Sequence, residues 1–283
     1  MTSSSAPEHT QHTAPSVSVI LVNFNGLADT RVAIRSLLAH SPGSEVIVVD
    51  NCSSDGSVEA LKKEFAGAKI IARQTNDGFA VGCNRGADEA IGKYLFFLNN
   101  DTSMASDVPR SLAEFMEATP SVGICGPRIL NPDGSFQLSA GFDQGLFSEW
   151  IMRRWQRRLR EGDPELAEEL ERKFFDKNVE WVSGAALMIG AELFRRVGGF
   201  DESFFMYFED ADLCRRVRSL GRTVQCVHRV SLTHALGRSA MKENSRIQRE
   251  YRKSQIHYYR KHASWMEVVF LELYLLLSGR LPH

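Results

Sequence analysis

The first hundred residues alternate between short apolar runs and segments whose apolar positions recur at helical spacing. The apolar runs are residues 17–22, 45–49, 69–72 and 94–98, and the first is rich in β-branched residues. After the first run, four apolar positions suit one buried helix face, namely Val32, Ile34, Leu37 and Leu38. We expect Asp29 or Thr30 to cap that helix, and later helices to end near Phe65 and Ile91. Strands and helices alternating with short connections are typical of βαβ units, so the pattern predicts a mostly parallel sheet flanked by helices.

The second half of the chain has a less regular pattern. Asp107–Pro109 is typical of a helix start, and residues 129–136 are typical of a hairpin. The pattern also predicts helices in residues 150–177, 192–197 and 208–220, and strands in residues 122–125, 181–189 and 223–227. No repeat or flexible linker divides the halves. We therefore expect one continuous α/β domain over residues 17–240, followed by a helical segment over residues 241–283.

The overall composition narrows the class of protein. The chain has 283 residues, 43% of them apolar and 24% charged, with a formal net charge of −1. These values are ordinary for a globular protein, and they give no reason to expect a nucleic-acid partner. The five cysteines are scattered and form no Cys-x-x-Cys pair, which favours free thiols in a reducing, cytoplasmic compartment. Residues 1–16 contain no apolar run, so we expect a disordered tail and no signal peptide.

Polar residues follow several of the predicted strands, namely Asn23, Asp50, Asn99, Asn100 and Asp101. The carboxyl ends of parallel strands meet at one edge of the sheet, where such folds bind ligands. We therefore expect these side chains to lie close together. The Asp101 carboxylate there suits a hard divalent cation that is shared with a phosphate. Asn and Asp also favour turns for backbone reasons, so each residue alone leaves that alternative open.

A glycine-containing turn between Asn76 and Asn84 joins the same edge and includes Gly78, Phe79 and Gly82. Glycines let a backbone approach a ligand closely, and a helix N-terminus attracts phosphate. The spacing matches neither G-x-G-x-x-G nor a G-x-x-x-x-G-K-[ST] loop, which disfavours a dinucleotide site and a P-loop. A turn without any ligand remains the alternative.

Three carboxylates, Glu209, Asp210 and Asp212, begin a predicted helix after a run rich in aromatic residues. Acids at a helix N-terminus match the helix dipole, which is a structural explanation. Carboxylates beside aromatic walls are also a setting in which a general base has a tuned pKa. Arg215 and Arg216, one turn later, are alternative partners for these acids. His234 after a strand is of interest as a metal ligand only if it meets Asp101.

Eight segments, in this order, together resemble the family 2 glycosyltransferases with a GT-A fold, and more narrowly the rhamnosyltransferase-like branch that builds bacterial polysaccharides. The segments are residues 19–25, 48–57, 76–84, 98–101, 181–185, 199–202, 208–213 and 234–239. The resemblance implies a GT-A-type sheet with a nucleotide-sugar half over residues 17–104. It also implies a smaller acceptor half over residues 105–240.

The resemblance further implies inverting transfer from a nucleotide-diphosphate sugar, dTDP-rhamnose or a UDP-sugar, to a saccharide or lipid-linked acceptor. The donor side would consist of Asn23, Asp50, Asn76, Gly78, Phe79, Asn84, Asn99 and Asn100. Asp101 and His234 would bind Mg²⁺ or Mn²⁺, and Asp210 would be the general base. The acceptor side would consist of Trp181, Glu209 and Asp212. The chain departs from the family's frequent Asp-x-Asp metal motif because Asn99 occupies its first position.

Two other functions remain open. A sugar nucleotidyltransferase also combines a nucleotide, a metal and an α/β sheet. It typically carries a basic, glycine-rich loop after the first strand, and the turn Asn23–Gly26 has no basic residue. A non-catalytic carbohydrate-binding relative of the fold is favoured only by Asn99.

The C-terminal segment lies outside the resemblance. Six basic residues precede an apolar stretch, residues 265–277, and they are Arg246, Arg249, Arg252, Lys253, Arg260 and Lys261. The apolar stretch includes Glu267 and Glu272 and is too short to span a bilayer. A basic helix followed by an apolar one suits peripheral attachment to the inner face of the plasma membrane. Packing on the domain or on a second subunit of a homodimer is the alternative.

Overall fold

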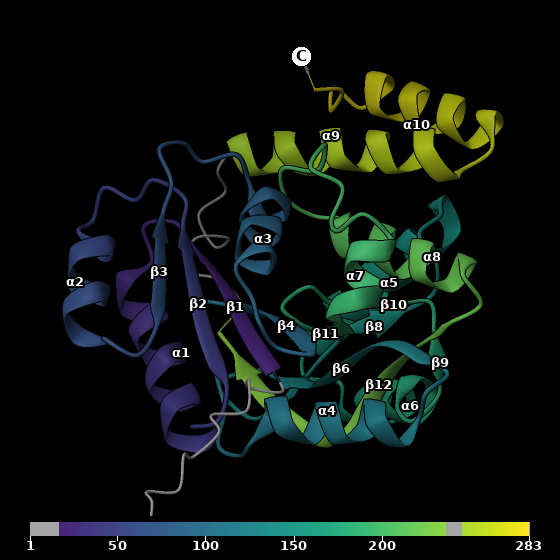
Figure 1. The fold of residues 1–283 in the computed structure, drawn as a ribbon. Coiled ribbons are helices and arrows are strands. Elements are labelled where there is room, and N and C mark those ends of the chain that lie inside the picture. Colours follow the sequence, from purple (N-terminus) through teal and green to yellow (C-terminus); the bar gives the residue numbers. More distant parts are fainter. Residues whose placement is uncertain (1–16, 236–244, 283) are drawn as a thin grey trace, which may run out of the picture.

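Four parallel strands form one half of the central sheet in the computed structural model, which describes residues 17–235 and 245–282. Their order is β3 (Lys69–Ala72), β2 (Glu45–Asp50), β1 (Val17–Asn23) and β4 (Tyr94–Asn99). Strands β1, β2 and β4 are buried on both faces, which explains their continuous apolar runs. The predicted parallel sheet is therefore confirmed, and it is drawn in purple and blue in Figure 1.

The sheet continues with strands from the second half of the chain. Beside β4 lie β11 (Ala186–Gly190), β6 (Val122–Leu130), β12 (Thr223–His234) and β5 (Thr102–Ser103), in that order. Strand β11 is antiparallel to β4 and β6, whereas β6 and β12 are parallel to each other. Both β6 and β12 are longer than predicted, and β12 passes an irregularity between Val227 and Ser231 before it resumes pairing. That extension carries β12 as far as His234.

Helices cover both faces of the sheet. Helices α1 (Leu27–His40), α2 (Ser57–Glu64) and α4 (Val108–Ala118) contribute to one apolar core. Helices α3 (Phe79–Asp88), α6 (Pro164–Phe174), α7 (Ala191–Arg196) and α8 (Glu209–Ser219) contribute to the other. Helix α1 begins at Leu27 with Gly26 as its N-cap, earlier than the predicted caps Asp29 and Thr30. Thr30 is buried inside the helix, and its hydroxyl donates to Asn23 Oδ1.

Several short strands shape the second half. Strand β7 (Phe136–Gln137) pairs with β6, which confirms the predicted hairpin, and β9 (Asn178–Val179) pairs with β12. Strands β8 (Ala140–Gly141) and β10 (Trp181–Val182) form a separate ladder. The strand predicted over residues 181–189 is therefore two strands, separated by a turn through Ser183–Ala185.

The C-terminal helices α9 (Ser245–His262) and α10 (Trp265–Leu277) lie together at one end of the molecule (Figure 1). A third apolar cluster joins Tyr258 and Tyr259 of α9 to Phe204 and Phe208 of the domain. Helix α9 therefore packs on the domain, and α10 packs on α9. Helix α5 (Leu146–Arg160) also contacts α9, through Glu149. The predicted tail, residues 1–16, and motif residues 236–239 lie outside the described residues.

Candidate functional site

The polar ends of β1, β2 and β4 meet at one edge of the sheet, as the sequence predicted. Asn23 is fully buried, and its Nδ2 donates to Asp50 Oδ2 over 2.6 Å. Its Oδ1 accepts from Asn100 Nδ2 over 3.1 Å. The backbone N–H of Ser53 donates to the other Asp50 oxygen over 2.8 Å. Asp50 is also fully buried, so these residues fix the floor of the edge, and the partly exposed Asn100 is the member that solvent reaches.

The turn before α3 is held against the segment that precedes α8. Asn76 Oδ1 accepts from the Gly78 N–H over 3.2 Å, and the Phe79 N–H donates to the Phe205 carbonyl over 2.8 Å. Gly78 has a φ of +97°, and a Cβ there would lie 2.2 Å from the Phe205 oxygen. The close approach that requires this glycine is thus to the protein's own backbone. Asn76, Gly78 and Phe79 therefore line a turn whose position depends on residues 203–208.

Asn84, predicted on the donor side, bonds the loop before α8. Its Oδ1 accepts from the Phe200 N–H and its Nδ2 donates to the Phe200 carbonyl, each over 2.9 Å. The Asn84 carboxamide in α3 therefore bonds both the N–H and the carbonyl of Phe200. The donor-side role of Asn84 stays a prediction, and in this structure its polar atoms hold the loop at residues 199–202.

Asp101 and His234 lie side by side, as the family resemblance implied. Strand β5 pairs with β12 so that Thr102 lies opposite His234, and this register brings Asp101 Oδ1 to 3.0 Å from His234 Nε2. The Ala235 N–H also donates to the Asp101 carbonyl over 2.9 Å. Asn99 Nδ2 lies 3.2 Å from the same His234 nitrogen. The predicted metal corner thus contains one carboxylate, one imidazole and one carboxamide.

These residues fit a divalent ion that is shared with a substrate. Two neighbouring ligands of an octahedral ion with bonds of about 2.1 Å lie about 3.0 Å apart. The Asp101–His234 separation of 3.0 Å matches that spacing. Within the described part of the chain, no group of three or more His, Cys, Asp and Glu side chains is placed to hold a metal. Mg²⁺ commonly takes only one or two protein ligands and completes its shell with phosphates and water.

Gln137 is a site residue that the sequence did not suggest. Its Oε1 lies 2.8 Å from His234 Nδ1, and its Nε2 donates to Asn131 Oδ1 over 2.9 Å. A carboxamide oxygen only accepts, so Nδ1 donates its proton to Gln137 and Nε2 faces Asp101. Such outer partners orient metal-binding histidines. A single glutamine in a two-residue strand carries no spacing signal that would have identified it.

Asp210 is a partly exposed carboxylate in the first turn of α8. Its Oδ2 accepts from the Gly184 N–H over 2.8 Å, and burial raises its pKa despite that bond. The preceding residues Tyr207 and Phe208 have φ values of +71° and +68°, a conformation that is strained for aromatic residues. The backbone is therefore held in an unfavourable turn where it presents Asp210.

The turn between β10 and β11 connects the Asp210 and Asp101 corners. The Gly184 N–H donates to Asp210, and the carbonyl of the next residue, Ala185, accepts from the Asn99 N–H over 2.9 Å. Phe79 also approaches this turn, since its ring lies 3.6 Å from a Cβ built on Gly184. Asp210, the end of β4 and the turn before α3 therefore converge on Gly184.

Glu209, predicted on the acceptor side, is a buried carboxyl at the start of α8. It is buried, and burial followed by the Asp210 charge raises its pKa well above the usual value. Its Oε2 has no hydrogen-bond partner among the described residues. The acceptor-side role of Glu209 stays a prediction, and its burial means that an acceptor would reach it only through a rearrangement of the turn before α8. Trp181 stays an acceptor-side prediction: it is partly exposed, and its Nε1 donates to the Phe142 carbonyl.

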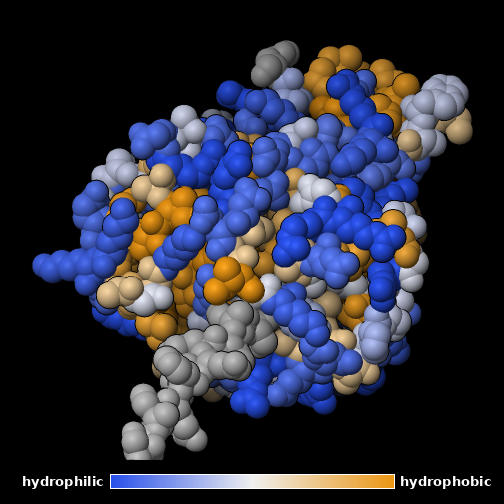
Figure 2. Space-filling model, in the orientation of Figure 1, coloured by the Kyte–Doolittle hydropathy of each residue, from blue (hydrophilic) through white to orange (hydrophobic). Residues whose placement is uncertain are grey.

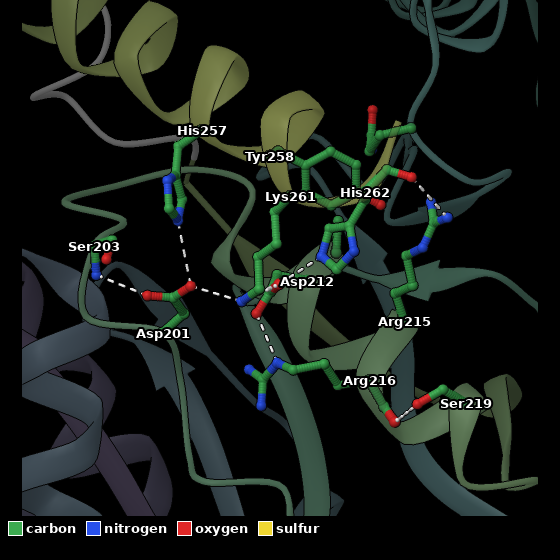
Figure 3. A network of polar contacts seen from close by, with 12 residues as sticks. Asp201, Ser203, Asp212, Arg215, Arg216, Ser219, His257, Tyr258, Lys261 and His262 are labelled. Carbon is green, nitrogen blue, oxygen red and sulfur yellow. Dashed lines mark hydrogen bonds and ion pairs between the residues drawn. The ribbon is translucent and has the colours of Figure 1, made fainter. Parts of the chain in front are cut away.

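Asp212 belongs to an ion network that fastens α9 to the domain (Figure 3). It is fully buried, and one carboxylate oxygen accepts from Arg216 over 2.8 Å. The other oxygen contacts Lys261 Nζ at 2.8 Å and His262 Nε2 at 2.7 Å. Nearby, Asp201 contacts Lys261 and His257. The acceptor-side role of Asp212 stays a prediction, and in this structure one oxygen is bonded within α8 and the other by α9.

Comparison with protein families and known sequences agrees with this geometry. A model of the family described as Glycosyl transferase family 2 matches residues 18–193. An N-acetylglucosaminyl-diphospho-decaprenol L-rhamnosyltransferase of Mycobacterium tuberculosis is 26% identical over 255 residues, covering 83% of this chain and 80% of that one. The O-antigen biosynthesis protein RfbC of Myxococcus xanthus is 30% identical over 227 residues, covering 78% of this chain and 17% of the relative.

Solved structures share the fold at low sequence identity. A mannosyltransferase from Pyrobaculum calidifontis, solved with GDP-Man and Mn²⁺, has a TM-score of 0.61 and is 16% identical, covering 88% of this chain and 64% of that one. TarS residues 1–349 from S. aureus, solved with UDP, has a TM-score of 0.56 and is 14% identical, covering 84% of this chain and 65% of that one. The chain thus spans somewhat less than two thirds of these neighbours, and the GT-A-type fold is confirmed.

Proposed function

The chain belongs to glycosyl transferase family 2, and we propose that it is an inverting glycosyltransferase that uses a nucleotide-diphosphate sugar. The observation that carries the proposal is the turn at Gly184–Ala185. It bonds Asp210 on one side and the end of β4 on the other. This turn therefore connects Asp210, which is suited to accept a proton, with the Asp101 corner, which is suited to hold a diphosphate.

Asp210 is the general base of the proposed reaction. The Gly184 N–H fixes one oxygen of its carboxylate, and burial raises its pKa, which makes the ionised form a stronger base. Asp210 would remove the proton from the acceptor hydroxyl as that oxygen attacks the anomeric carbon. Attack from the face opposite the leaving diphosphate inverts the configuration of that carbon.

Asp101 and His234 would hold Mg²⁺ or Mn²⁺ at the donor diphosphate. The ion, when bound, would stabilise the negative charge that develops on the leaving nucleoside diphosphate. Gln137 keeps the Nε2 atom of His234 directed at that position. Asn99, in the place of a second carboxylate, supplies a neutral carboxamide beside the same nitrogen. The Pyrobaculum neighbour was solved with Mn²⁺, which supports a divalent ion for this fold.

The donor and acceptor follow from the relatives. The names of relatives include an L-rhamnosyltransferase and an O-antigen biosynthesis protein, which supports dTDP-rhamnose as the first donor to test and UDP-sugars next. The decaprenol diphosphate in the first name supports a lipid-linked saccharide as acceptor. Such an acceptor would place the reaction at the inner face of the plasma membrane. Asn100, partly exposed on the polar floor, would contact the donor.

A thermal-shift and turnover experiment tests the function. The full chain would be heated with dTDP, UDP, GDP and their sugars, with and without Mn²⁺. We expect the correct donor to stabilise the fold by about 2.7 kcal/mol at a hundredfold excess over its dissociation constant. Slow hydrolysis of that donor should release the nucleoside diphosphate. A chain that binds the donor without any turnover would be a non-catalytic relative, and release of pyrophosphate from a nucleoside triphosphate would indicate a nucleotidyltransferase.

A further inference from the structure

Helix α10 exposes an apolar face that the described residues leave uncovered. Eight of its thirteen residues are exposed large hydrophobics, namely Trp265, Met266, Val269, Phe270, Leu273, Tyr274, Leu276 and Leu277. Phe270 is 65% exposed and Leu277 is 87% exposed. Figure 2 shows orange side chains gathered where Figure 1 draws α10. Exposed apolar patches of this kind mark interaction sites.

The exposed residues occupy one continuous side of α10. With 3.6 residues per turn, they cover about half of the helix circumference, opposite the buried pair Leu271 and Leu275. Glu267 and Glu272 fall at the two borders of this side. The Glu267 carboxylate accepts from the Ser264 cap, and Glu272 pairs with Arg260 of α9 at 2.7 Å. The apolar face itself therefore has no charged residue.

Positive charge accompanies this face. Residues 245–282 contain seven Lys and Arg residues and three Glu residues, whereas the whole chain contains 34 basic and 35 acidic residues. The Arg153 and Arg252 guanidinium groups lie 5.7 Å and 5.3 Å from the centroid of the Tyr251 ring. Arg280, beyond α10, donates to the hydroxyl of Tyr274 on the exposed face. Arg153 pairs with the buried Glu149 at 3.1 Å, so of these three arginines Arg252 and Arg280 are the cations available to an anionic group.

The start of α5 also exposes aromatic side chains beside an arginine. Phe147 and Trp150 at the start of α5 are 72% and 56% exposed, and their rings stack with centroids 6.1 Å apart. The Arg154 guanidinium lies over the Trp150 ring. Helix α5 is fixed to α9 because Gln255 Nε2 and the Tyr259 hydroxyl donate to the buried Glu149 carboxylate. Most exposed large hydrophobics of the described residues thus lie on α10 or at the start of α5.

We propose that the exposed face of α10, together with Arg252 and Arg280, binds the headgroup layer of a bilayer that contains anionic phospholipid. An amphipathic helix with aromatic and aliphatic residues on one side and basic residues beside it is suited to that boundary. None of the helices in residues 17–235 and 245–282 combines the length and hydrophobicity needed to cross a membrane, so contact at the interface is the arrangement that α10 permits.

A second copy of the chain fits this surface less well. The segment that includes α10 has an excess of basic residues, which would repel the same segment of a second copy. A bilayer needs no matching shape, and its anionic headgroups complement Arg252 and Arg280. The charge of the segment therefore favours lipid.

Docking through α10 would orient the catalytic half of the molecule. Helix α9 contacts the segment that presents Asp210, since Ser254 donates to the Met206 carbonyl over 2.7 Å and Tyr258 packs on Phe208. The bilayer would therefore hold Asp210 at a constant distance from lipid-linked acceptors. This consequence rests on the proposed function, whereas lipid binding itself does not.

Vesicle flotation of the full chain tests the proposal. We expect binding to phosphatidylcholine vesicles that contain phosphatidylglycerol, and weaker binding as salt is added. Phe270→Asp should weaken binding about 10- to 100-fold, because one large side chain no longer enters the bilayer. Arg280→Gln should weaken binding about fivefold on anionic vesicles only. Val32→Asp, on the 52% exposed Val32 of α1, is the matched control and should bind like the wild type.

Light scattering without lipid, together with circular dichroism of each variant, completes the test. A monomer that binds vesicles through α10 supports the proposal. A dimer that Phe270→Asp dissociates, with no vesicle binding by the wild type, overturns it in favour of a second copy. A monomer that ignores vesicles also overturns it. Sugar transfer to a water-soluble acceptor reports separately on the proposed function, and should be unchanged in Phe270→Asp.

Discussion

Asp101 Oδ1 lies 3.0 Å from His234 Nε2, although the two residues come from the β4–β5 turn and from the far end of β12. The contact depends on the irregularity in β12, which lets that strand reach β5 with Thr102 opposite His234. A two-ligand corner of this kind binds a divalent ion well only when a phosphate completes its shell. Metal binding and donor binding should therefore be coupled.

Asp101→Ala should remove that coupling. We expect Mn²⁺ to strengthen donor binding by the wild type and to have little effect on the variant. The loss should be at least the 10- to 100-fold that removal of an outer partner costs at metal sites. Calorimetric titration of the donor with and without Mn²⁺ measures the difference. Asp88→Ala, at an exposed position in α3, is the control. Equal Mn²⁺ dependence in Asp101→Ala would rule out the metal assignment.

Gln137→Leu should weaken metal binding without removing a metal ligand. The variant loses the oxygen that accepts from His234 Nδ1, so Nε2 is no longer held as the unprotonated nitrogen. We expect roughly 10- to 100-fold weaker Mn²⁺ affinity with the donor present, and an unchanged circular dichroism spectrum. Gln137→Glu keeps an acceptor oxygen and should restore most of the affinity. If Leu and Glu behave alike, Gln137 does not act through His234.

The sheet and its polar edge could be predicted because parallel strands buried on both faces leave continuous apolar runs. Those runs end where the chain leaves the sheet, which places Asn23, Asp50 and Asn100 at one edge. The lengths of β6 and β12 could not be predicted, because their outer residues pair across the sheet without a continuous apolar run. The approach of His234 to Asp101 was therefore inferred from the family resemblance, and the structure supplies its physical cause.

The direction of a side chain on a helix could not be predicted from its position. Glu209, Asp210 and Asp212 share one helical turn, yet one is buried, one faces Gly184 and one faces α9. Asp212 finds Lys261 and His262 only after the chain has formed α9, beyond the part that matches the family model. Asn84 likewise bonds Phe200, which is far away in the sequence.

Asp210→Asn should abolish transfer while donor affinity is kept. The carboxamide keeps an acceptor for the Gly184 N–H but cannot take a proton, so we expect kcat to fall by about 10²- to 10⁴-fold. In the wild type, the raised pKa means that kcat increases with pH as Asp210 ionises, at pH values above the ordinary 3.8. A pH profile at saturating donor and acceptor measures this acidic limb. Near wild-type turnover in the variant would exclude Asp210 as the base.

Glu209→Gln should be tolerated, and should become favourable as the pH rises. The raised pKa of Glu209 means that the folded state prefers the protonated acid. The stability that this preference provides is present below the unfolded pKa and is lost as pH rises through the folded pKa. A glutamine stays neutral, so its unfolding free energy does not fall in this way. Between the unfolded and folded pKa, the unfolding free energy of the variant should rise relative to that of the wild type by at most about 1.4 kcal/mol per pH unit. Urea unfolding across the pH range checks the sign, and a growing wild-type advantage would show that Glu209 is needed ionised.

Asp212→Asn should loosen α9 from the domain. The side chain is fully buried among Arg216, Lys261 and His262, so the variant leaves buried positive charge without its partner. Removing one partner of such a group costs about 3–5 kcal/mol of unfolding free energy.

The pH dependence of Asp212→Asn distinguishes lost charge from lost packing. The Asp212 pKa is lowered by His262, Lys261 and Arg216, whose effects together exceed the opposing effect of burial, the largest single influence. Its contribution to stability is therefore present above the unfolded pKa, near 3.8, and is lost as pH falls through the folded pKa. The difference between wild type and variant should thus be constant near neutral pH and shrink in acid. Asp88→Asn, which breaks an exposed pair with Arg85, should show no measurable difference.

Hydrogen exchange should locate the loss of stability in α9 and in residues 204–211, because Tyr258 and Tyr259 pack there. A uniform loss over the whole domain would mean that Asp212 stabilises α8 alone and does not anchor α9.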